Sequence, residues 1–373
     1  MSWILDEQRR MLRDSAQNFL AERAPVAQLR ALRDRHDALG HDPALWRAFG
    51  EQGYSATLVP EAHGGLGLGV AEAGLIAEQI GHTLAASPFF STAVLAAWLL
   101  KTAGSVDQQQ RWLPRIAAAD AIVALAVDEQ SRHKPALLAT SAARDSAGWR
   151  LDGDKRFVVD GHIADAWVVA ARADAGTALL LVPKGTAGVS VERTVMADAH
   201  NATRLRFNGA HVGADALVGS LEHGAALLEG VLDVGRAVVA SELLGLADQV
   251  FERTVEYLKQ RKQFERALGE FQALQHRAAE LFCDLELTRA IVRQAQAALD
   301  GTAADAPLRV AQAKARACLT ANRAVQEGVQ MHGGIGMTDE LEIGLFMKRA
   351  RVLQELFGDA AFHMDRMALL SGF

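Results

Sequence analysis

The sequence has few cysteines, and this scarcity limits the kinds of protein that it can encode. Its 373 residues include only two, Cys283 and Cys318, and they are not spaced as metal ligands. A disulfide framework and a cysteine-based metal site are therefore not expected, and we predict no metal site of any kind. The low cysteine content also suits a reducing compartment such as the cytoplasm.

The chain also lacks an excess of positive charge and a long apolar run. Its formal net charge is −6, which argues against the basic surface that nucleic-acid binding requires. The most apolar stretch, Ala93 to Leu100, is far shorter than the roughly 20 residues of a membrane-spanning helix. The first residues carry Asp6 and Glu7 and no apolar signal core. We therefore expect a soluble cytoplasmic protein with neither nucleic acid nor membrane as a partner.

The pattern of residues divides the chain into three regions of different character. Residues 1–119 show helical periodicity, residues 120–218 consist of short β-branched runs between turn signals, and residues 219–373 return to long helical patterns. Hydrophobic residues make up 50% of the chain, enough for a large core. We predict a multi-domain α+β protein with an N-terminal helical domain, a middle β-sandwich or barrel of about seven strands, and a C-terminal four-helix bundle.

Local signals predict several element boundaries. Ser2 is a candidate cap for the first helix, and Gly81 is a candidate stop for a helix that begins at Val70. Asp152-Gly153 separates two β-branched runs and is a hairpin signal. The predicted inward stripe of the first helix is Leu5, Gln8, Met11, Leu12, Ser15 and Phe19.

The last region is predicted to form two long helices. One runs toward Gly301, and the next covers Pro307 to His332. Apolar residues step by three and four along one face of the first of these helices, at Phe271, Leu274, Ala278, Leu281 and Leu285. These apolar faces could exceed what one chain can bury, so we expect an oligomer.

Three sequence motifs narrow down the kind of protein that has this order of regions. They are Pro60-Glu61-Ala62-His63-Gly64-Gly65-Leu66-Gly67, Arg261-Lys262-Gln263-Phe264 with Phe271-Gln272, and Gln330-Met331-His332-Gly333-Gly334-Ile335-Gly336. The glycines at 65–69 follow no strand and do not fit G-x-G-x-x-G, which excludes a Rossmann loop. In their order and spacing the motifs resemble those of the flavin-dependent acyl-CoA dehydrogenase family over nearly the whole chain.

The resemblance implies an FAD site that is shared between subunits. The flavin ring lies beside the middle domain of one subunit, and the arginine motif and glycine loop of a neighbour hold the diphosphate and adenosine. Arg261 is expected to pair with a phosphate, and Phe264 to pack on the cofactor. The cofactor-binding candidates are Arg261, Gln263, Phe264, Gln272, Gln330, Gly333 and Gly334.

The resemblance also implies an acyl-CoA substrate, a homo- or heterotetramer, and electron-transferring flavoprotein as the electron acceptor. Asp233 and Arg236 match positions that the family uses around the acyl-CoA, and they are the candidate substrate-binding residues. The reaction that the family carries out is α,β-dehydrogenation, in which a base removes the α-proton and a flavin accepts the β-hydride.

The glutamate that the family uses as this base is absent from both of its usual positions. Gly358 occupies the commoner position, and Gly235, directly before Arg236, occupies the other. Glycine has no titratable group, so neither can be the base. The middle region departs from the family as well: Phe157-Val158-Val159 replaces Trp-x-Thr, and Asp128-Glu129-Gln130-Ser131 replaces a longer loop.

Three functions are therefore open from the sequence. The chain could be the small subunit of a heteromeric enzyme, similar to the pimeloyl-CoA dehydrogenase small-subunit type, with the base on its partner. It could be self-sufficient with a relocated base, Asp359 or Glu242. We expect Asp359 instead to be a helix N-cap, and Glu242 to be either a buried hydrogen-bonded carboxylate or a charge on a helix face. It could also be a non-catalytic acyl-CoA or protein-binding module that lost flavin, which the intact Arg261 and Gly333 motifs argue against.

Overall fold

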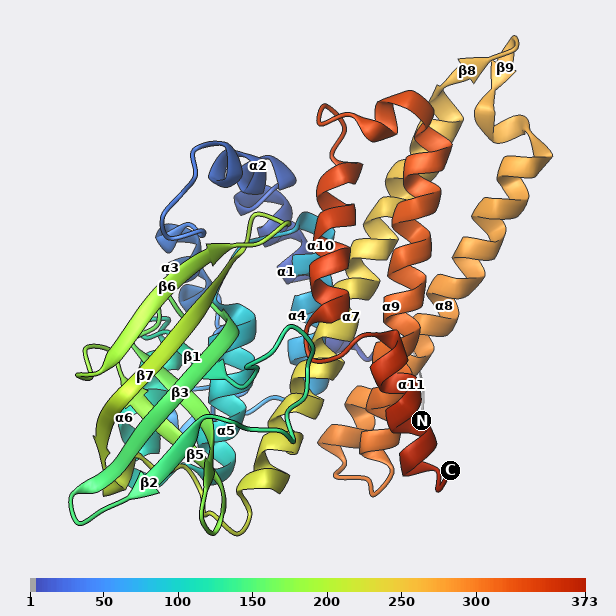
Figure 1. Ribbon diagram of the computed structural model, residues 1–373. Coiled ribbons are helices and arrows are strands. Elements are labelled where there is room, and N and C mark those ends of the chain that lie inside the picture. Colours follow the sequence, from blue (N-terminus) through green and yellow to red (C-terminus); the bar gives the residue numbers. More distant parts are fainter. Residues whose placement is uncertain (1–4) are drawn as a thin grey trace. The chain divides into compact units, whose positions relative to one another are not determined.

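The computed structural model describes residues 5–373 and shows helices, then a sheet, then helices along the chain, as predicted (Figure 1). The predicted cap Ser2 lies outside the described residues. The chain forms two compact units. The first unit comprises residues up to Ala31, Val70–Ala85 and Arg236–Phe373, and the second comprises Leu32–Gly69 and Ala86–Gly235. Between residues 5 and 373, no helix is both long and apolar enough to span a membrane.

The elements have the following bounds. The helices are α1 (Glu7–Arg23), α2 (Val26–Asp34), α3 (Pro43–Glu51), α4 (Val70–Thr83), a π-helical segment (Phe89–Ala96) leading into α5 (Ala97–Ala103), α6 (Val106–Ala117), α7 (Gly224–Gln260), α8 (Gln272–Asp300), α9 (Ala306–His332), α10 (Ile343–Glu355) and α11 (Ala360–Leu370). The strands are β1 (Val123–Ala126), β2 (Ser141–Arg144), β3 (Gly148–Val159), β4 (Ala166–Ala173), β5 (Gly176–Pro183), β6 (Val189–Val195), β7 (Asn201–Gly213), and the short β8 (Lys262–Gln263) and β9 (Arg266–Ala267).

The first helix differs in phase from the predicted stripe. Asp6 caps α1, and its Oδ1 accepts a hydrogen bond from the Arg9 backbone N–H at 2.8 Å. Ala16 and Leu20 are the buried residues of α1, whereas Met11 is 66% exposed. The stripe prediction was partly wrong. Leu5, Leu12 and Phe19 are half-buried as members of the stripe, whereas Gln8, Met11 and Ser15 are exposed, and the fully buried positions are Ala16 and Leu20.

The middle of the chain forms one seven-stranded sheet within the described residues, in the order β1-β4-β2-β3-β7-β6, with β5 paired to β4. The predicted hairpin at Asp152-Gly153 is wrong, because β3 runs through both residues with a register shift against β7. A Cβ at Gly153 would stand 2.6 Å from the Thr140 hydroxyl oxygen, and its φ is +143°. The glycine therefore marks a bulge inside a strand and a close approach by Thr140, which a turn signal alone cannot distinguish.

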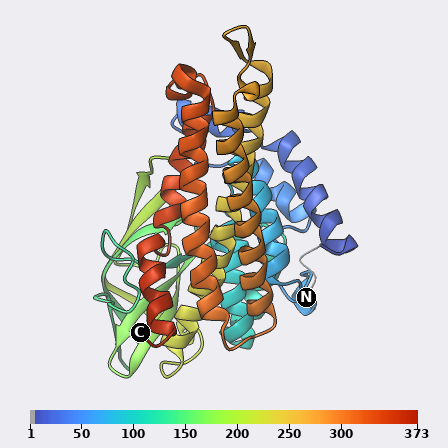
Figure 2. The ribbon, with the colours of Figure 1, turned by 90° about the vertical axis from the view of Figure 1, so that its right-hand side faces the viewer.

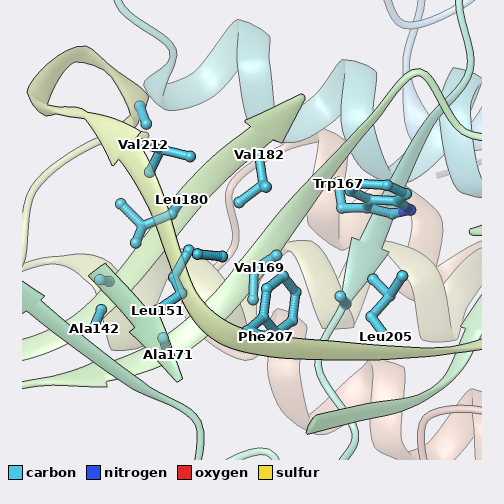
Figure 3. Packing of buried hydrophobic residues seen from close by; sticks show 14 of the residues in the cluster. Ala142, Leu151, Trp167, Val169, Ala171, Leu180, Val182, Leu205, Phe207 and Val212 are labelled. Carbon is cyan, nitrogen blue, oxygen red and sulfur yellow. The ribbon is translucent and has the colours of Figure 1, made fainter. Parts of the chain in front are cut away.

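The core of this sheet consists of aromatic and aliphatic side chains that converge from several strands (Figure 3). Leu205 and Phe207 are buried and alternate with the half-buried Arg204 and the exposed Arg206, as predicted for a half-buried strand. Trp167 is also buried, and its indole N–H donates to the Gly161 carbonyl at 2.8 Å. Because the polar end of the indole is satisfied, this large side chain can lie in the core without an unpaired donor.

The helical bundle of the first unit contains α8 and α9 side by side (Figure 2). Leu281 and Leu285, two members of the predicted apolar face of α8, are buried. Gly81 does not end α4, which continues to Thr83. A Cβ at Gly81 would lie 2.1 Å from the Glu242 carbonyl oxygen, and a Cβ at Gly245 would lie 1.8 Å from the Glu78 carbonyl oxygen. The prediction of a helix stop was wrong because glycine here permits the backbones of α4 and α7 to touch.

A Gly245→Ala substitution tests this close contact between α4 and α7. Because the added methyl group meets a carbonyl that cannot move freely, the free energy of unfolding should fall by about 1–3 kcal/mol. Gly344→Ala is the matched control, since Gly344 lies in α10 with no heavy atom near its would-be Cβ. It should leave stability unchanged or raise it by up to about 1 kcal/mol. Urea unfolding measures both, and equal effects of the two substitutions would contradict the contact.

Charged side chains are buried between α4, α7 and α8. Arg289 on α8 donates to Glu78 on α4 at 3.0 Å and to Asp248 on α7 at 2.7 Å. Burial, together with the nearby Glu78 and Glu252 carboxylates, raises the pKa of Asp248 to about 7 despite the guanidinium of Arg289. The carboxyl group of Asp248 therefore holds a proton more tightly in the folded chain than in the unfolded one, where its pKa is about 3.8.

This raised pKa predicts that Asp248 makes the fold less stable as the pH rises. Its unfavourable contribution develops between about pH 4, the unfolded pKa, and about pH 7, the folded pKa. Asp248→Asn removes the titration. The variant should therefore gain stability relative to the wild-type chain between pH 5 and pH 8, by on the order of 2 kcal/mol. Urea unfolding at both pH values measures the difference, and a difference that does not change with pH would contradict the raised pKa.

Candidate functional site

The first part of the candidate site lies where α7 ends and a short hairpin begins. Arg261 follows α7, and β8 and β9 form the hairpin that projects beyond the bundle (Figure 1). Phe264 and Glu265 form its tip with φ values of +53° and +64°, the left-handed pair that a tight hairpin turn requires. Phe264 is 84% exposed. Among residues 5–373, the exposed Arg261 guanidinium forms no ion pair, so it is available to an anion.

The second part is the glycine loop that follows α9. Gly333 has φ +67°, and a Cβ at Gly333 or Gly334 would meet no heavy atom within 4 Å. A ligand can therefore approach the backbone closely beside both glycines, although the Gly333 N–H itself already donates to the Gln330 carbonyl. Gly336 differs, because a Cβ there would stand 2.6 Å from the Val329 carbonyl oxygen. Gly336 is thus required by packing.

These two parts lie at the same end of the bundle. The Tyr257 ring of α7 and the His332 ring of α9 have centroids 4.4 Å apart, and the Tyr257 hydroxyl donates to the His332 carbonyl at 3.4 Å. Gln272 begins α8 at this end, and Gln330 lies in the last turn of α9. Every cofactor-binding candidate is exposed, namely Arg261, Gln263, Phe264, Gln272, Gln330, Gly333 and Gly334.

The donors at this end of the bundle match the chemistry of a diphosphate. A guanidinium binds phosphate oxygens in a planar, charge-assisted geometry, and glycine allows a ligand to approach the backbone closely. Side-chain amides of Gln263, Gln272 and Gln330 add further hydrogen-bonding groups. The residues present therefore fit the diphosphate end of FAD, and no group of three or more metal-binding side chains occurs among residues 5–373.

A separate cluster of buried cationic and imidazole groups surrounds the loop between α10 and α11. The Arg236 Nε and the His363 Nε2 both donate to the Phe357 carbonyl at 3.2 Å. Lys314 Nζ donates to the carbonyls of Leu353 and Gln354 at 3.1 Å and to that of Gly358 at 3.0 Å. The loop carbonyls and the negative end of α10 therefore point inward at these donors.

The electrostatics of this cluster keep its histidine neutral. Burial and the neighbouring Lys314, Arg236 and Arg366 charges lower the pKa of His363 to about 2. Burial also lowers the pKa of Lys314. We did not predict Lys314 from the sequence, although a lysine among Ala311, Ala315 and Cys318 on one helix was a usable signal. A lysine in such surroundings must find carbonyl or carboxylate partners.

The two candidates for a relocated base are held by structural hydrogen bonds. Asp359 caps α11, and its Oδ1 accepts from the Phe362 backbone N–H at 2.8 Å. Glu242 is buried, and its Oε1 accepts from the Arg349 Nε at 2.8 Å and from the Arg349 Nη2 at 2.6 Å. These are the two structural roles that we expected for Asp359 and Glu242.

Buried glycines occupy residues 235 and 358, the two positions that the resemblance assigns to the base. Gly358 has φ +105°, and a Cβ there would stand 2.3 Å from the Phe362 ring. The loop is therefore closed to a side chain at position 358. Gly235 is buried within α7, as are the two candidate substrate-binding residues Asp233 and Arg236.

The middle sheet carries the segment that replaces the family's Trp-x-Thr. Phe157 has φ +54° and is 48% exposed, whereas Val158 is buried. The shortened loop at 128–131 is bound tightly to the sheet, because the buried Lys155 Nζ donates to Glu129 at 2.7 Å. Burial alone would raise the pKa of Glu129, but its bonds from Lys155 and two backbone N–H groups lower it.

A helical region, a curled sheet and a helical bundle whose end exposes an arginine, side-chain amides and a glycine loop are typical of a class of flavin-dependent oxidoreductases. Comparison with known proteins gives the family. Its models match residues 6–120 as an acyl-CoA dehydrogenase N-terminal domain, residues 123–210 as the middle domain, and residues 222–369 as the C-terminal domain. The chain belongs to the acyl-CoA dehydrogenase family, whose cofactor is FAD.

Individual relatives agree with this assignment. Acyl-CoA dehydrogenase FadE27 of Mycobacterium tuberculosis is 32% identical over 333 residues, which are 87% of each chain. The ChsE4-ChsE5 complex of M. tuberculosis contains a chain with a TM-score of 0.92 and 28% identity that covers 100% of both chains. A variant of the Tcur3481-Tcur3483 steroid ACAD has a TM-score of 0.90 and 29% identity over 98% of both chains.

Substitution of Asp359 tests its role as a cap. Asp359→Ala should lower the free energy of unfolding by about 1 kcal/mol, because the Phe362 N–H loses its acceptor. Asp359→Asn retains an acceptor oxygen and should cost only a few tenths of a kcal/mol. Urea unfolding measures both variants. An equal cost for the two would show that the negative charge of Asp359, and not its capping bond, is what the structure needs.

Proposed function

We propose that this chain is the small subunit of a heteromeric acyl-CoA dehydrogenase, and that its partner subunit supplies the catalytic base. The observation that carries the proposal is an asymmetry within one chain. Both usual base positions are glycine, and Gly358 lies in a loop that is closed to a side chain. The bundle end, in contrast, keeps every group that the family uses for the diphosphate.

The proposal assigns a role to each exposed group at the bundle end. Arg261 pairs with the diphosphate, Gly333 and Gly334 let the cofactor approach the backbone closely, and Phe264 packs against the cofactor or the neighbouring chain. The amides of Gln263, Gln272 and Gln330 orient the cofactor. FAD, when bound, supplies a hydride acceptor. A carboxylate of the partner subunit removes the α-proton of the acyl-CoA.

The relatives support this reading. Two similar structures, the ChsE4-ChsE5 complex and the Tcur3481-Tcur3483 steroid ACAD, are each named after two proteins. We propose by analogy a heterotetramer that acts on a bulky acyl-CoA, such as a steroid side-chain, aromatic or dicarboxylic thioester. Electron-transferring flavoprotein is the proposed acceptor, and the cytoplasm is the proposed location.

The structure offers less support for the other two functions. A self-sufficient enzyme would need Asp359 or Glu242 as its base, and both carboxylates are already occupied by structural hydrogen bonds. A module that had lost flavin would have no need for an unpaired Arg261 and an open glycine loop at the same bundle end.

Co-expression with a family member that retains its glutamate tests the proposal. A positioned base contributes roughly 10²–10⁴-fold to the rate. The isolated chain should therefore show at least about 100-fold less acyl-CoA-dependent dye reduction than the complex. Substituting the partner's glutamate by glutamine should abolish the higher rate of dye reduction by the complex. Asp359→Asn in this chain should leave that rate unchanged.

Three outcomes would separate the alternatives. Turnover by the isolated chain close to that of the complex would contradict the proposal, and its loss in Asp359→Asn or Glu242→Gln would identify a relocated base. A complex without flavin absorbance would favour the non-catalytic module. Arg261→Ala should lower the flavin content of the complex without unfolding it.

A further inference from the structure

One stripe of α7 contacts both parts of the bundle end that carries the cofactor-binding candidates. Arg253, Tyr257 and Arg261 follow one another at steps of four residues, the spacing that places side chains one above the other on a helix. Arg261 lies just past the last residue of α7, and its backbone N–H still donates to the Tyr257 carbonyl at 2.8 Å. The backbone of this arginine is therefore held by Tyr257.

The Tyr257 side chain contacts the residue that directly precedes the glycine loop. Its ring stacks on the His332 ring with centroids 4.4 Å apart and an interplanar angle of 33°, and its hydroxyl donates to the His332 carbonyl at 3.4 Å. His332 is 5% exposed, and its Nδ1 lies 2.7 Å from the Gly328 carbonyl, so Nδ1 carries the proton. His332 is thus held both by its own helix, α9, and by α7.

The glycine loop is positioned by its two ends. No other part of the described chain packs where a side chain of Gly333 or Gly334 would lie. At one end, Gly333 leaves α9 with φ +67° and ψ −140°, directly after His332. At the other end, Glu342 forms an ion pair with Arg253, which belongs to the same α7 stripe. Because both ends of the loop contact one helix, α7 sets the place of the loop.

The kind of contact favours a role in positioning over simple core packing. Tyr257 is only half-buried, so its ring is not a core side chain. An aliphatic pair would fill the same space without a buried imidazole, whose burial lowers the pKa of His332. A hydrogen bond is directional, whereas apolar packing is not. The polar pair therefore fixes the orientation of the loop as well as filling space.

We propose that Tyr257 is a positioning residue that sets the place of Arg261 relative to the glycine loop, so that both can hold the same diphosphate. This role rests on the proposed cofactor site, and it adds the residue that couples the two halves of that site. Groups that bind one ligand from two sides must be held within about 0.5 Å of the productive geometry. Loss of the Tyr257 contacts should therefore weaken FAD binding without any contact between Tyr257 and the cofactor.

The test is a titration with FAD of the flavin-free complex that this chain forms with a glutamate-bearing family member. Flavin fluorescence gives the dissociation constant. Tyr257→Leu removes both the stacked ring and the hydroxyl, and it should weaken FAD binding about tenfold. Tyr257→Phe retains the ring and loses only the hydroxyl, so it should weaken FAD binding about threefold.

Phe251→Leu is the matched control, because it also replaces an aromatic ring by leucine on α7. Phe251 lies on another face of the helix and packs against Phe282, with ring centroids 6.1 Å apart. This variant should leave the FAD dissociation constant unchanged, even where it lowers thermal stability as much as Tyr257→Leu does.

A double-mutant cycle with Arg261→Ala separates positioning from a general loosening of the bundle. Arg261→Ala alone should weaken FAD binding roughly tenfold. The double variant Tyr257→Leu/Arg261→Ala should weaken it clearly less than the roughly hundredfold product of the two single losses. The reason is that Tyr257 acts in part through Arg261, whose guanidinium is already absent in the double variant.

Several results would overturn the role of Tyr257. One is a Tyr257→Leu complex that binds FAD as tightly as the unsubstituted complex, or, if that variant does not assemble, a Tyr257→Phe complex that does so. Others are equal weakening in Phe251→Leu and a double variant whose loss equals the product of the single losses. Unchanged FAD affinity in Arg261→Ala would contradict the cofactor site and this role together. Turnover by the isolated chain would contradict only the heteromeric function, and the same titrations then apply to that chain.

Discussion

The capping of the loop between α10 and α11 by Lys314 is the constraint on which the functional argument depends. A fully buried ammonium is tolerated only when its hydrogen bonds are satisfied, and here three backbone carbonyls satisfy them. Gly358 lies in the same loop with φ +105°, a backbone conformation that favours glycine.

A second theme is the contrast between satisfied and unsatisfied polar groups. Within the first unit, Arg289 bridges the buried carboxyl groups of Glu78 and Asp248. Glu242 and Arg349 form another pair there. The bundle end is the opposite, since the exposed Arg261 guanidinium forms no ion pair within residues 5–373. Closed networks stabilise a fold, whereas open donors on a rigid scaffold bind ligands. Glu242 therefore has a structural role, whereas Arg261 is available to a ligand.

Much of the fold was predictable because it depends on local periodicity. The long helices ending near Gly301 and His332, and the alternation of Leu205 and Phe207, follow from side-chain spacing alone. The roles of Gly81 and Gly153 were predicted wrongly for one shared reason. A glycine that ends an element and a glycine that admits a neighbouring backbone look alike in sequence, and only the identity of the neighbour, Glu242 or Thr140, distinguishes them.

The sequence by itself determined the family and the order of its regions, because these follow from residue identity and order. Only the tertiary structure decided which groups Glu242 and Lys314 bind, because their partners lie far away in the chain. Asp359, in contrast, caps α11 through the nearby Phe362 N–H, which a local pattern can predict.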